Sequence, residues 1–134
     1  MKDKYNWENK TILVVDDEYM NYLLFEAILE ETNSRIIHAM NGKIAVEECL
    51  NNKNIDLVLM DLKMPVLNGY EATKAIKDKR KDLPIIAQTA YTASEDYHKC
   101  MNAGFDEYIP KPVERDLFLF KLNNFLGKHS SPEN

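Results

Sequence analysis

The fold is decided by one stretch of the chain, Ile55-Asp56-Leu57-Val58-Leu59-Met60-Asp61-Leu62-Lys63-Met64-Pro65. A short, nearly unbroken apolar run bounded by turn residues is typical of a strand buried on both faces at the centre of a parallel sheet. Asp61 ends the run, and open α/β sheets bind their ligands beyond the carboxyl ends of the strands. Pro65 prevents the chain from continuing in the sheet. The stretch therefore predicts a central strand that ends in a candidate ligand-binding carboxylate.

On both sides of this stretch, apolar runs and helical patterns alternate, five times in all. The alternation predicts an α/β fold with helices on both faces of a doubly wound parallel sheet, a flavodoxin-like (βα)5 architecture in a single domain. The second strand ends in Ala39-Met40-Asn41, which carries no ionisable group, and this favours an edge position and the strand order 2-1-3-4-5. The other predicted strands are Thr11 to Val15, Arg35 to Ala39, Pro84 to Gln88 and Glu107 to Ile109.

Helix signals fill the segments between the strands. After the first strand, an apolar stripe of Met20, Leu23, Leu24, Ala27 and Ile28 predicts an amphipathic helix. The last helix is expected from Val113 to Leu126. Cap positions are predicted at Asn41, at the capping boxes Asn68/Glu71 and Thr92/Glu95, and at Gly104 after the fourth helix.

Composition fits one globular domain, since 45% of the 134 residues are hydrophobic and 29% are charged. The net charge of −5 provides no basic field for a phosphate backbone, so direct nucleic-acid binding is not expected. Nothing in the chain has the character of a membrane span or a signal peptide, and we expect a cytoplasmic location, with any membrane anchor elsewhere in a larger parent protein. We expect a polar lead-in or linker over residues 1–9, the domain over 10–127, a flexible tail over 128–134, and Cys49 and Cys100 as buried free thiols.

Polar residues follow four of the five predicted strands at their carboxyl ends. Asp16 and Asp17 follow the first strand, Asp61 the third and Thr89 the fourth, and Lys111 comes just after the fifth. Converging carboxylates repel one another by up to ~4 kcal/mol per close pair at an effective dielectric of about 20. Lys111 offsets part of this charge, and a divalent ion would offset the rest. Mg²⁺ suits such a site because it accepts one or two carboxylates and keeps positions open for waters and a phosphoryl group.

Asp61 is the natural nucleophile of this pattern, because a carboxylate can form an aspartyl-phosphate. Lys111, the Thr89 hydroxyl and the metal would then hold the phosphoryl oxygens. Each residue also has an ordinary structural interpretation: the acidic pair could cap the first helix, Thr89 could be a β-branched strand residue, and Lys111-Pro112 could be a simple loop. The joint pattern on four strand ends favours the site.

Four sequence blocks occur in order along the chain: Val14-Val15-Asp16-Asp17-Glu18, Met60-Asp61-Leu62-Lys63-Met64-Pro65 with Asn68-Gly69, Thr89-Ala90, and Lys111-Pro112. With these blocks, residues 10 to 127 resemble a response-regulator receiver domain of two-component signalling. The resemblance implies that the isolated domain does not turn over substrate beyond its own phosphorylation and dephosphorylation.

The resemblance implies that Asp61 accepts a phosphoryl group from a phosphohistidine of a histidine kinase or a histidine phosphotransfer domain. It also implies a Mg²⁺ site, with Mn²⁺ as an alternative ion, formed by Asp16, Asp17, Asp61 and the backbone carbonyl of Lys63. The peptide bond between Lys111 and Pro112 is typically cis in this family.

Switching is also implied by the resemblance, with Thr89 and Tyr108 as the switch pair. The readout would be the face formed by the fourth helix, the fifth strand and the fifth helix. Lys63 and Tyr91 occupy the two positions that tune the lifetime of the phosphoryl group, and bulky Tyr91 is expected to restrict the hydrolytic water.

The last helix carries more apolar residues than one stripe needs. Phe118, Leu122 and Phe125 could form a patch for a partner, including a homodimer through this helix, or the helix could simply be well buried.

Several alternatives remain open. The sequence between Asp61 and Thr73 resembles receivers of hybrid histidine kinases, and a stand-alone regulator is the competing interpretation. A Mg²⁺-dependent phosphatase of the haloacid-dehalogenase type would need an aspartate at position 63, where this chain has Lys63. A receiver used only as an interaction surface would be expected to lack Asp61 or Lys111. The three histidines, His38, His98 and His129, show no metal-ligand spacing.

Overall fold

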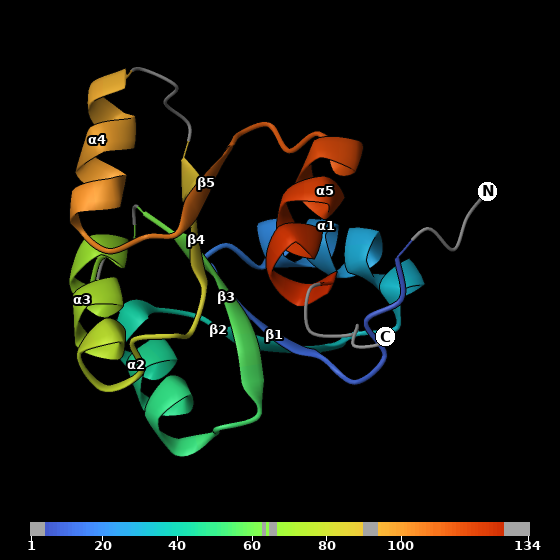
Figure 1. The fold of residues 1–134 in the computed structure, drawn as a ribbon, viewed down its shortest axis with the longest axis horizontal. Helices are drawn as coiled ribbons and strands as arrows, with labels where there is room; N and C mark the ends of the chain where they lie inside the picture. Colours follow the sequence, from blue (N-terminus) through green and yellow to red (C-terminus); the bar gives the residue numbers. More distant parts are fainter. Residues whose placement is uncertain (1–4, 63, 65–66, 90–93, 128–134) are drawn as a thin grey trace.

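The computed structural model describes residues 5–62, 64, 67–89 and 94–127. Its centre is a five-stranded sheet in the order β2-β1-β3-β4-β5, in which all neighbouring strands are parallel (Figure 1). The predicted fold class and strand order are therefore confirmed. The strands are β1 (Thr11–Val15), β2 (Arg35–Ala39), β3 (Ile55–Asp61), β4 (Ile85–Thr89) and β5 (Glu107–Pro110).

Helices cover both faces of the sheet. One face carries α1 and α5, and the other carries α2, α3 and α4 (Figure 1). Among the described residues, none of the helices is long and apolar enough to cross a membrane. The helices are α1 (Tyr19–Leu29) with the short 3-10 turn η1 (Glu30–Thr32), α2 (Gly42–Asn51), α3 (Gly69–Lys79), α4 (Ser94–Asn102) and α5 (Arg115–Leu126).

The central strand β3 contributes side chains to both layers of the core. Leu57 and Leu59 pack toward α1 and α5, whereas Val58 and Met60 pack toward α2, α3 and α4. This alternation follows from the pleat of a strand, whose successive side chains point to opposite faces. A strand that is apolar on both faces is fixed in its position, and the carboxylate at its end is fixed with it.

The helix ends follow the predicted caps where the structure describes them. The Asn41 side chain accepts a hydrogen bond from the Ile44 amide, and Asn68 and Glu71 form a reciprocal capping box. After α4, Gly104 has a φ of +104°, and the Phe105 amide donates to the carbonyl of Cys100 in a Schellman arrangement. The predicted cap at Thr92 lies outside the described residues.

The predicted apolar stripe of α1 is confirmed only in part: Leu23 and Ile28 pack against the core, but other members of the stripe face solvent. Met20 is 74% exposed and Leu24 is 48% exposed, whereas Tyr22, Phe25 and Leu29 are buried. The helix carries two overlapping apolar stripes, and the stripe with the larger aromatic surface is the one that packs. Phe25 meets Phe118 of α5 at a ring-centroid distance of 5.3 Å.

Of the two alternatives left open for α5, the partner patch of Phe118, Leu122 and Phe125 is wrong. Phe118 and Leu122 are fully buried, and Phe125 packs partly against the same core. The alternative, a well-buried helix, holds for these residues. The apolar residues of α5 that are exposed to solvent are instead Leu117 and Phe120, and Phe120 is 57% exposed.

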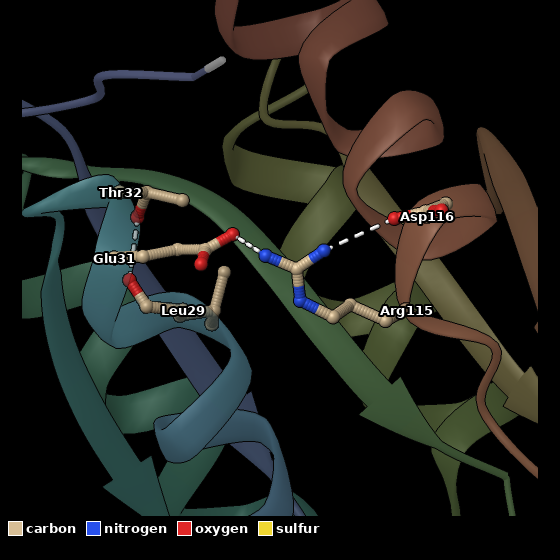
Figure 2. A network of polar contacts seen from close by, with 5 residues as sticks. All are labelled: Leu29, Glu31, Thr32, Arg115 and Asp116. Atoms are coloured by element: carbon tan, nitrogen blue, oxygen red, sulfur yellow. Dashed lines mark hydrogen bonds and ion pairs between the residues drawn. The ribbon is translucent and has the colours of Figure 1, made fainter. Parts of the chain in front are cut away.

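Three contacts join the N-terminal segment, η1 and α5 to one another. Trp7 is only 3% exposed; its backbone amide donates to the Thr32 carbonyl at 2.7 Å and its indole Nε1 to Asn123 Oδ1 at 3.2 Å. In addition, the Arg115 guanidinium lies between the carboxylates of Glu31 and Asp116 and pairs with both (Figure 2). Although the lead-in is polar in composition, Trp7 is therefore part of the packed domain.

We predict that Trp7→Ala lowers the free energy of unfolding by about 3 to 5 kcal/mol, since it leaves a large cavity and removes the bond to Asn123. Urea denaturation measures the change. The matched control is Tyr19→Ala, because Tyr19 is an aromatic residue that is 60% exposed and should cost much less. Equal stabilities of Trp7→Ala and the wild type would contradict the packing described here.

Candidate functional site

Three acidic side chains meet at the carboxyl ends of β1 and β3. Asp16 and Asp17 follow β1 and Asp61 ends β3, and each offers one carboxylate oxygen such that these oxygens all lie within 4.8 Å of one another. Asp16 and Asp61 are buried and Asp17 is exposed. The structure thus brings together the acidic residues that the sequence pattern indicated.

Lys111 reaches the same place from the far side of β4. Its Nζ lies 3.4 Å from Asp61 Oδ1, and its backbone amide donates to the Thr89 carbonyl at 2.8 Å. The peptide bond between Lys111 and Pro112 is cis, as the resemblance implied. One ammonium group therefore faces a pocket of negative charge.

Asp16 is the most constrained of the carboxylates. Its Oδ1 accepts a hydrogen bond from the Glu18 amide at 2.9 Å, whereas its buried Oδ2 has no hydrogen-bond partner. Burial raises the pKa of the Asp16 carboxyl above its ordinary value, and the charge of Asp61 raises it further, against the lowering effects of the Glu18 amide and of Lys111. Asp16 is thus costly to ionise in the absence of a cation.

The donor set fits a hard divalent cation. All of the side-chain donors are carboxylate oxygens, and the orphaned Oδ2 of Asp16 is an unused ligand atom. With Lys111 included, the cluster has a net charge of about −2, which one divalent ion would neutralise. Exposed Asp17 leaves the cluster open to solvent on one side.

Thr89 and Tyr108 lie on adjacent strands next to this cluster. Tyr108 is paired in register with Ala87, two residues before Thr89, so both side chains belong to the face of the sheet that carries α4. Thr89 is buried and Tyr108 is partly exposed. From α5, Lys121 donates to the Tyr108 carbonyl at 2.8 Å and lies 5.0 Å from the centre of the tyrosine ring.

Close backbone packing joins the start of α3 to the end of β3. A Cβ added at Gly69 would lie 2.5 Å from the Asp61 carbonyl oxygen, so only glycine fits there. The Gly69 amide also donates to the Leu62 carbonyl at 3.2 Å. Lys63 and Tyr91, which were assigned to the metal site and to tuning of the phosphoryl lifetime, lie outside the described residues.

His38 contributes to the site although its sequence pattern gave no reason to select it. From the edge strand β2, its Nε2 donates to the backbone carbonyl of Asp16 at 2.9 Å, and its ring stacks on Tyr22 at 4.2 Å. The only available signal was a polar residue within the apolar run of β2.

Comparisons with known proteins agree on one family. The sequence model described as the response regulator receiver domain matches residues 12–123. The chain is 31% identical over 120 residues to the polar-differentiation response regulator DivK of Brucella anthropi, covering 88% of this chain and 97% of DivK. It is 34% identical over 126 residues to hybrid signal transduction histidine kinase I of Dictyostelium discoideum, covering 88% of this chain but only 7% of the kinase.

Two solved structures are similar over most of the chain. One is the receiver domain of the sensor histidine kinase PA1611 of Pseudomonas aeruginosa PAO1 with a magnesium ion in its active-site cleft (33% identity, TM-score 0.81, 89% of this chain and 98% of that one). The other is the receiver domain of Ssk1 of Saccharomyces cerevisiae in complex with the histidine phosphotransfer protein Ypd1 (26% identity, TM-score 0.86, 94% of each chain).

We predict that Asp16→Asn stabilises the metal-free protein at neutral pH. Because the pKa of Asp16 is raised in the folded state, ionisation of this carboxyl costs stability progressively as the pH rises above its ordinary value of 3.8. The amide in the variant carries no charge and can donate to Asp61. The gain in thermal midpoint over the wild type should grow as the pH rises above 3.8 toward neutrality and shrink again in acid.

Asp78→Asn is the control for this experiment, because Asp78 is an exposed acidic residue on α3 outside the cluster. A loss of stability in Asp16→Asn at neutral pH without metal would refute the electrostatic account.

Proposed function

The chain belongs to the response regulator receiver domain family and is a receiver domain of a two-component phosphorelay, and on that premise we propose that Asp61 accepts the phosphoryl group. The observation that carries the proposal is the contact of 3.4 Å between Lys111 Nζ and Asp61 Oδ1 beside the aspartate cluster. Asp61 is a buried carboxylate that lies beside the solvent-exposed Asp17 and in contact with the ammonium group of Lys111.

In the proposed reaction, a carboxylate oxygen of Asp61 attacks the phosphorus of a phosphohistidine. A new P–O bond forms as the P–N bond breaks, and the electron pair of that bond returns to the imidazole nitrogen. Lys111 holds the transferred oxygens through its ammonium group, and the Thr89 hydroxyl donates to one of them. Since transfer of this kind depends mainly on positioning and charge, these residues supply what the reaction requires.

Asp16, Asp17, Asp61 and the backbone carbonyl of Lys63 would hold Mg²⁺, with Mn²⁺ as an alternative ion. The metal would neutralise the crowded carboxylates and the charge of the phosphoryl oxygens. The unpartnered Oδ2 of Asp16 supports the assignment, as does the magnesium ion in the similar receiver of PA1611.

Thr89 and Tyr108 are proposed as the switch pair. Phosphorylation adds roughly 1.5 to 2 negative charges and acceptor oxygens, which would draw the Thr89 hydroxyl toward Asp61 and open space for the Tyr108 ring. Lys121 supports a readout through α5, because it contacts both the carbonyl and the ring of Tyr108.

The proposed partner is a histidine kinase or a histidine phosphotransfer domain, supported by the complex of Ypd1 with the similar Ssk1 receiver. A homodimer through α5 would use the exposed Leu117 and Phe120. A cytoplasmic location is supported by the buried cysteines Cys49 and Cys100, which form no disulfide and so suit a reducing compartment.

Both forms of parent protein remain compatible with this function, because the relatives include a regulator of about this length and a long hybrid kinase. We propose residues 10–127 as the receiver unit, with residues 1–9 as a lead-in that is packed onto this unit through Trp7, and 128–134 as a tail. A phosphatase of the haloacid-dehalogenase type is disfavoured, because Lys63 stands where that class needs an acidic residue.

We predict that incubation with Mg²⁺ and acetyl phosphate adds the mass of one phosphoryl group to the wild type and none to Asp61→Asn. The amide of the variant is not a nucleophile, and chelation of the metal should abolish the gain in the wild type as well. Intact-protein mass spectrometry reads the result. The control is Asp82→Asn, an exposed acidic residue just before β4, at the amino ends of the strands, which should be phosphorylated normally. A phosphoryl gain in Asp61→Asn equal to that of the wild type would exclude Asp61.

A second prediction concerns Tyr91, which we propose restricts the water that hydrolyses the acyl phosphate. Tyr91→Ala should shorten the lifetime of the phosphorylated form, and Tyr91→Phe should preserve it. Decay of the phosphorylated mass after removal of the phosphodonor measures the lifetime, and an unchanged decay in Tyr91→Ala would remove this role.

A further inference from the structure

Gln88 is a buried polar residue that the proposed mechanism leaves unused. It lies on β4, is 0% exposed, and neither its Oε1 nor its Nε2 has a hydrogen-bond partner. Most buried polar atoms in proteins are hydrogen-bonded. Both ends of this carboxamide are therefore available to groups that come within reach.

An apolar side chain would suit the packing at this position better. Leaving a buried donor or acceptor unpaired costs about 1 to 3 kcal/mol, whereas an apolar group of similar shape avoids that cost. The neighbouring β4 residues Ile86 and Ala87 are apolar and fully buried. Packing thus gives no reason for a glutamine here, and polar groups retained at such a cost are characteristic of functional sites.

The position of Gln88 connects it to the phosphorylation site. It is paired in register with Asp61 on the neighbouring strand β3, and register partners in a parallel sheet present their side chains on the same face. Strand alternation supports this placement, because Ile86 and Leu59, each two residues earlier, both pack in the core under α1 and α5. Gln88 is therefore the lateral neighbour of Asp61.

The side chain of Lys111 also reaches Asp61 next to Gln88. It follows β5, whereas Asp61 is on β3, and β4 lies between these two strands. Adjacent strands are about 4.8 Å apart, so a lysine that contacts Asp61 from β5 extends its side chain across β4. The ion pair between Lys111 and Asp61 accordingly lies next to the strand position of Gln88.

We propose that Gln88 is a positioning residue for phosphoryl transfer, in which its Nε2 donates to Asp61 and its Oε1 accepts from Lys111 when a phosphoryl group is bound. The inference rests on the proposed role of Asp61. Phosphorylation draws the Lys111 ammonium from the Asp61 carboxylate toward the phosphoryl oxygens, and the Asp61 oxygen that this cation leaves can then accept a hydrogen bond from Gln88. The carboxamide supplies the donor and, at its other end, holds the displaced lysine.

The first test compares Gln88→Met with the wild type in urea denaturation and in phosphorylation by acetyl phosphate with Mg²⁺. Methionine keeps the length of the side chain without its polar atoms. We expect Gln88→Met to be at least as stable as the wild type and its phosphorylation rate to fall by about tenfold, the effect of losing one hydrogen bond to a charged group. Ile86→Met is the matched control, since Ile86 is equally buried on the same strand and face.

Each outcome of this test separates the two proposals. If the wild type gains no phosphoryl group, the proposed function fails. If the wild type and Gln88→Met are phosphorylated at the same rate, Asp61 keeps its role and the inference about Gln88 is overturned. Slow phosphorylation in the variant but not in Ile86→Met supports the inference.

A second measurement needs no substitution at Gln88. The side-chain amide protons of Gln88 are followed by ¹H–¹⁵N correlation NMR in the wild type with Mg²⁺ alone and after addition of beryllium fluoride, an acyl-phosphate mimic. We expect both protons to shift and their exchange with solvent to slow when the mimic is bound, and no such change in Asp61→Asn. Unaltered Gln88 amide signals in the wild type with bound mimic would overturn the proposal.

Discussion

The crowding of carboxylates at one edge of a rigid sheet is the constraint on which the rest of the structure depends. Asp16, Asp17 and Asp61 hold oxygens within 4.8 Å of one another, and the ammonium group of Lys111 lies 3.4 Å from an oxygen of Asp61. The carboxylates cannot relax apart, because β1 and β3 are buried strands in the middle of the sheet. The repulsion therefore persists in the folded protein, and it is relieved by binding positive charge rather than by movement of the backbone.

The other side of the site is connected to the surface through β5 and α5. Lys121 joins the Tyr108 carbonyl and ring to α5, and α5 is in turn fixed to the α1 side by Arg115 and by the bond between Trp7 and Asn123. Well-packed interfaces of this kind adopt discrete arrangements rather than deforming continuously. Lys121 thus connects Tyr108, which lies next to the aspartate cluster, directly to α5.

How much the sequence predicts depends on how many physical constraints act on each residue. The strands and their order were predictable because β3 is apolar on both faces and because ionisable residues follow β1, β3 and β5 but not β2. The buried face of α1 was not, because its sequence carries two apolar stripes and the choice depends on the contact between Phe25 and Phe118, which are far apart in the chain. The same reason applies to α5, where Phe118 and Leu122 face the core and Phe120 faces solvent.

Residues that support the site were missed for a different reason: they act through neighbours rather than by their own chemistry. His38 holds the backbone carbonyl of Asp16 from the edge strand, and Gln88 lies beside Asp61 on β4. Both residues interrupt an apolar run. A polar side chain in such a run lowers the stability of the fold unless a partner group compensates its burial. A buried strand tolerates a polar side chain most readily where a charged group can make use of it. In this sheet the candidate site residues lie at the strand ends. A polar residue that interrupts a neighbouring strand beside them is therefore a candidate for supporting the site residues.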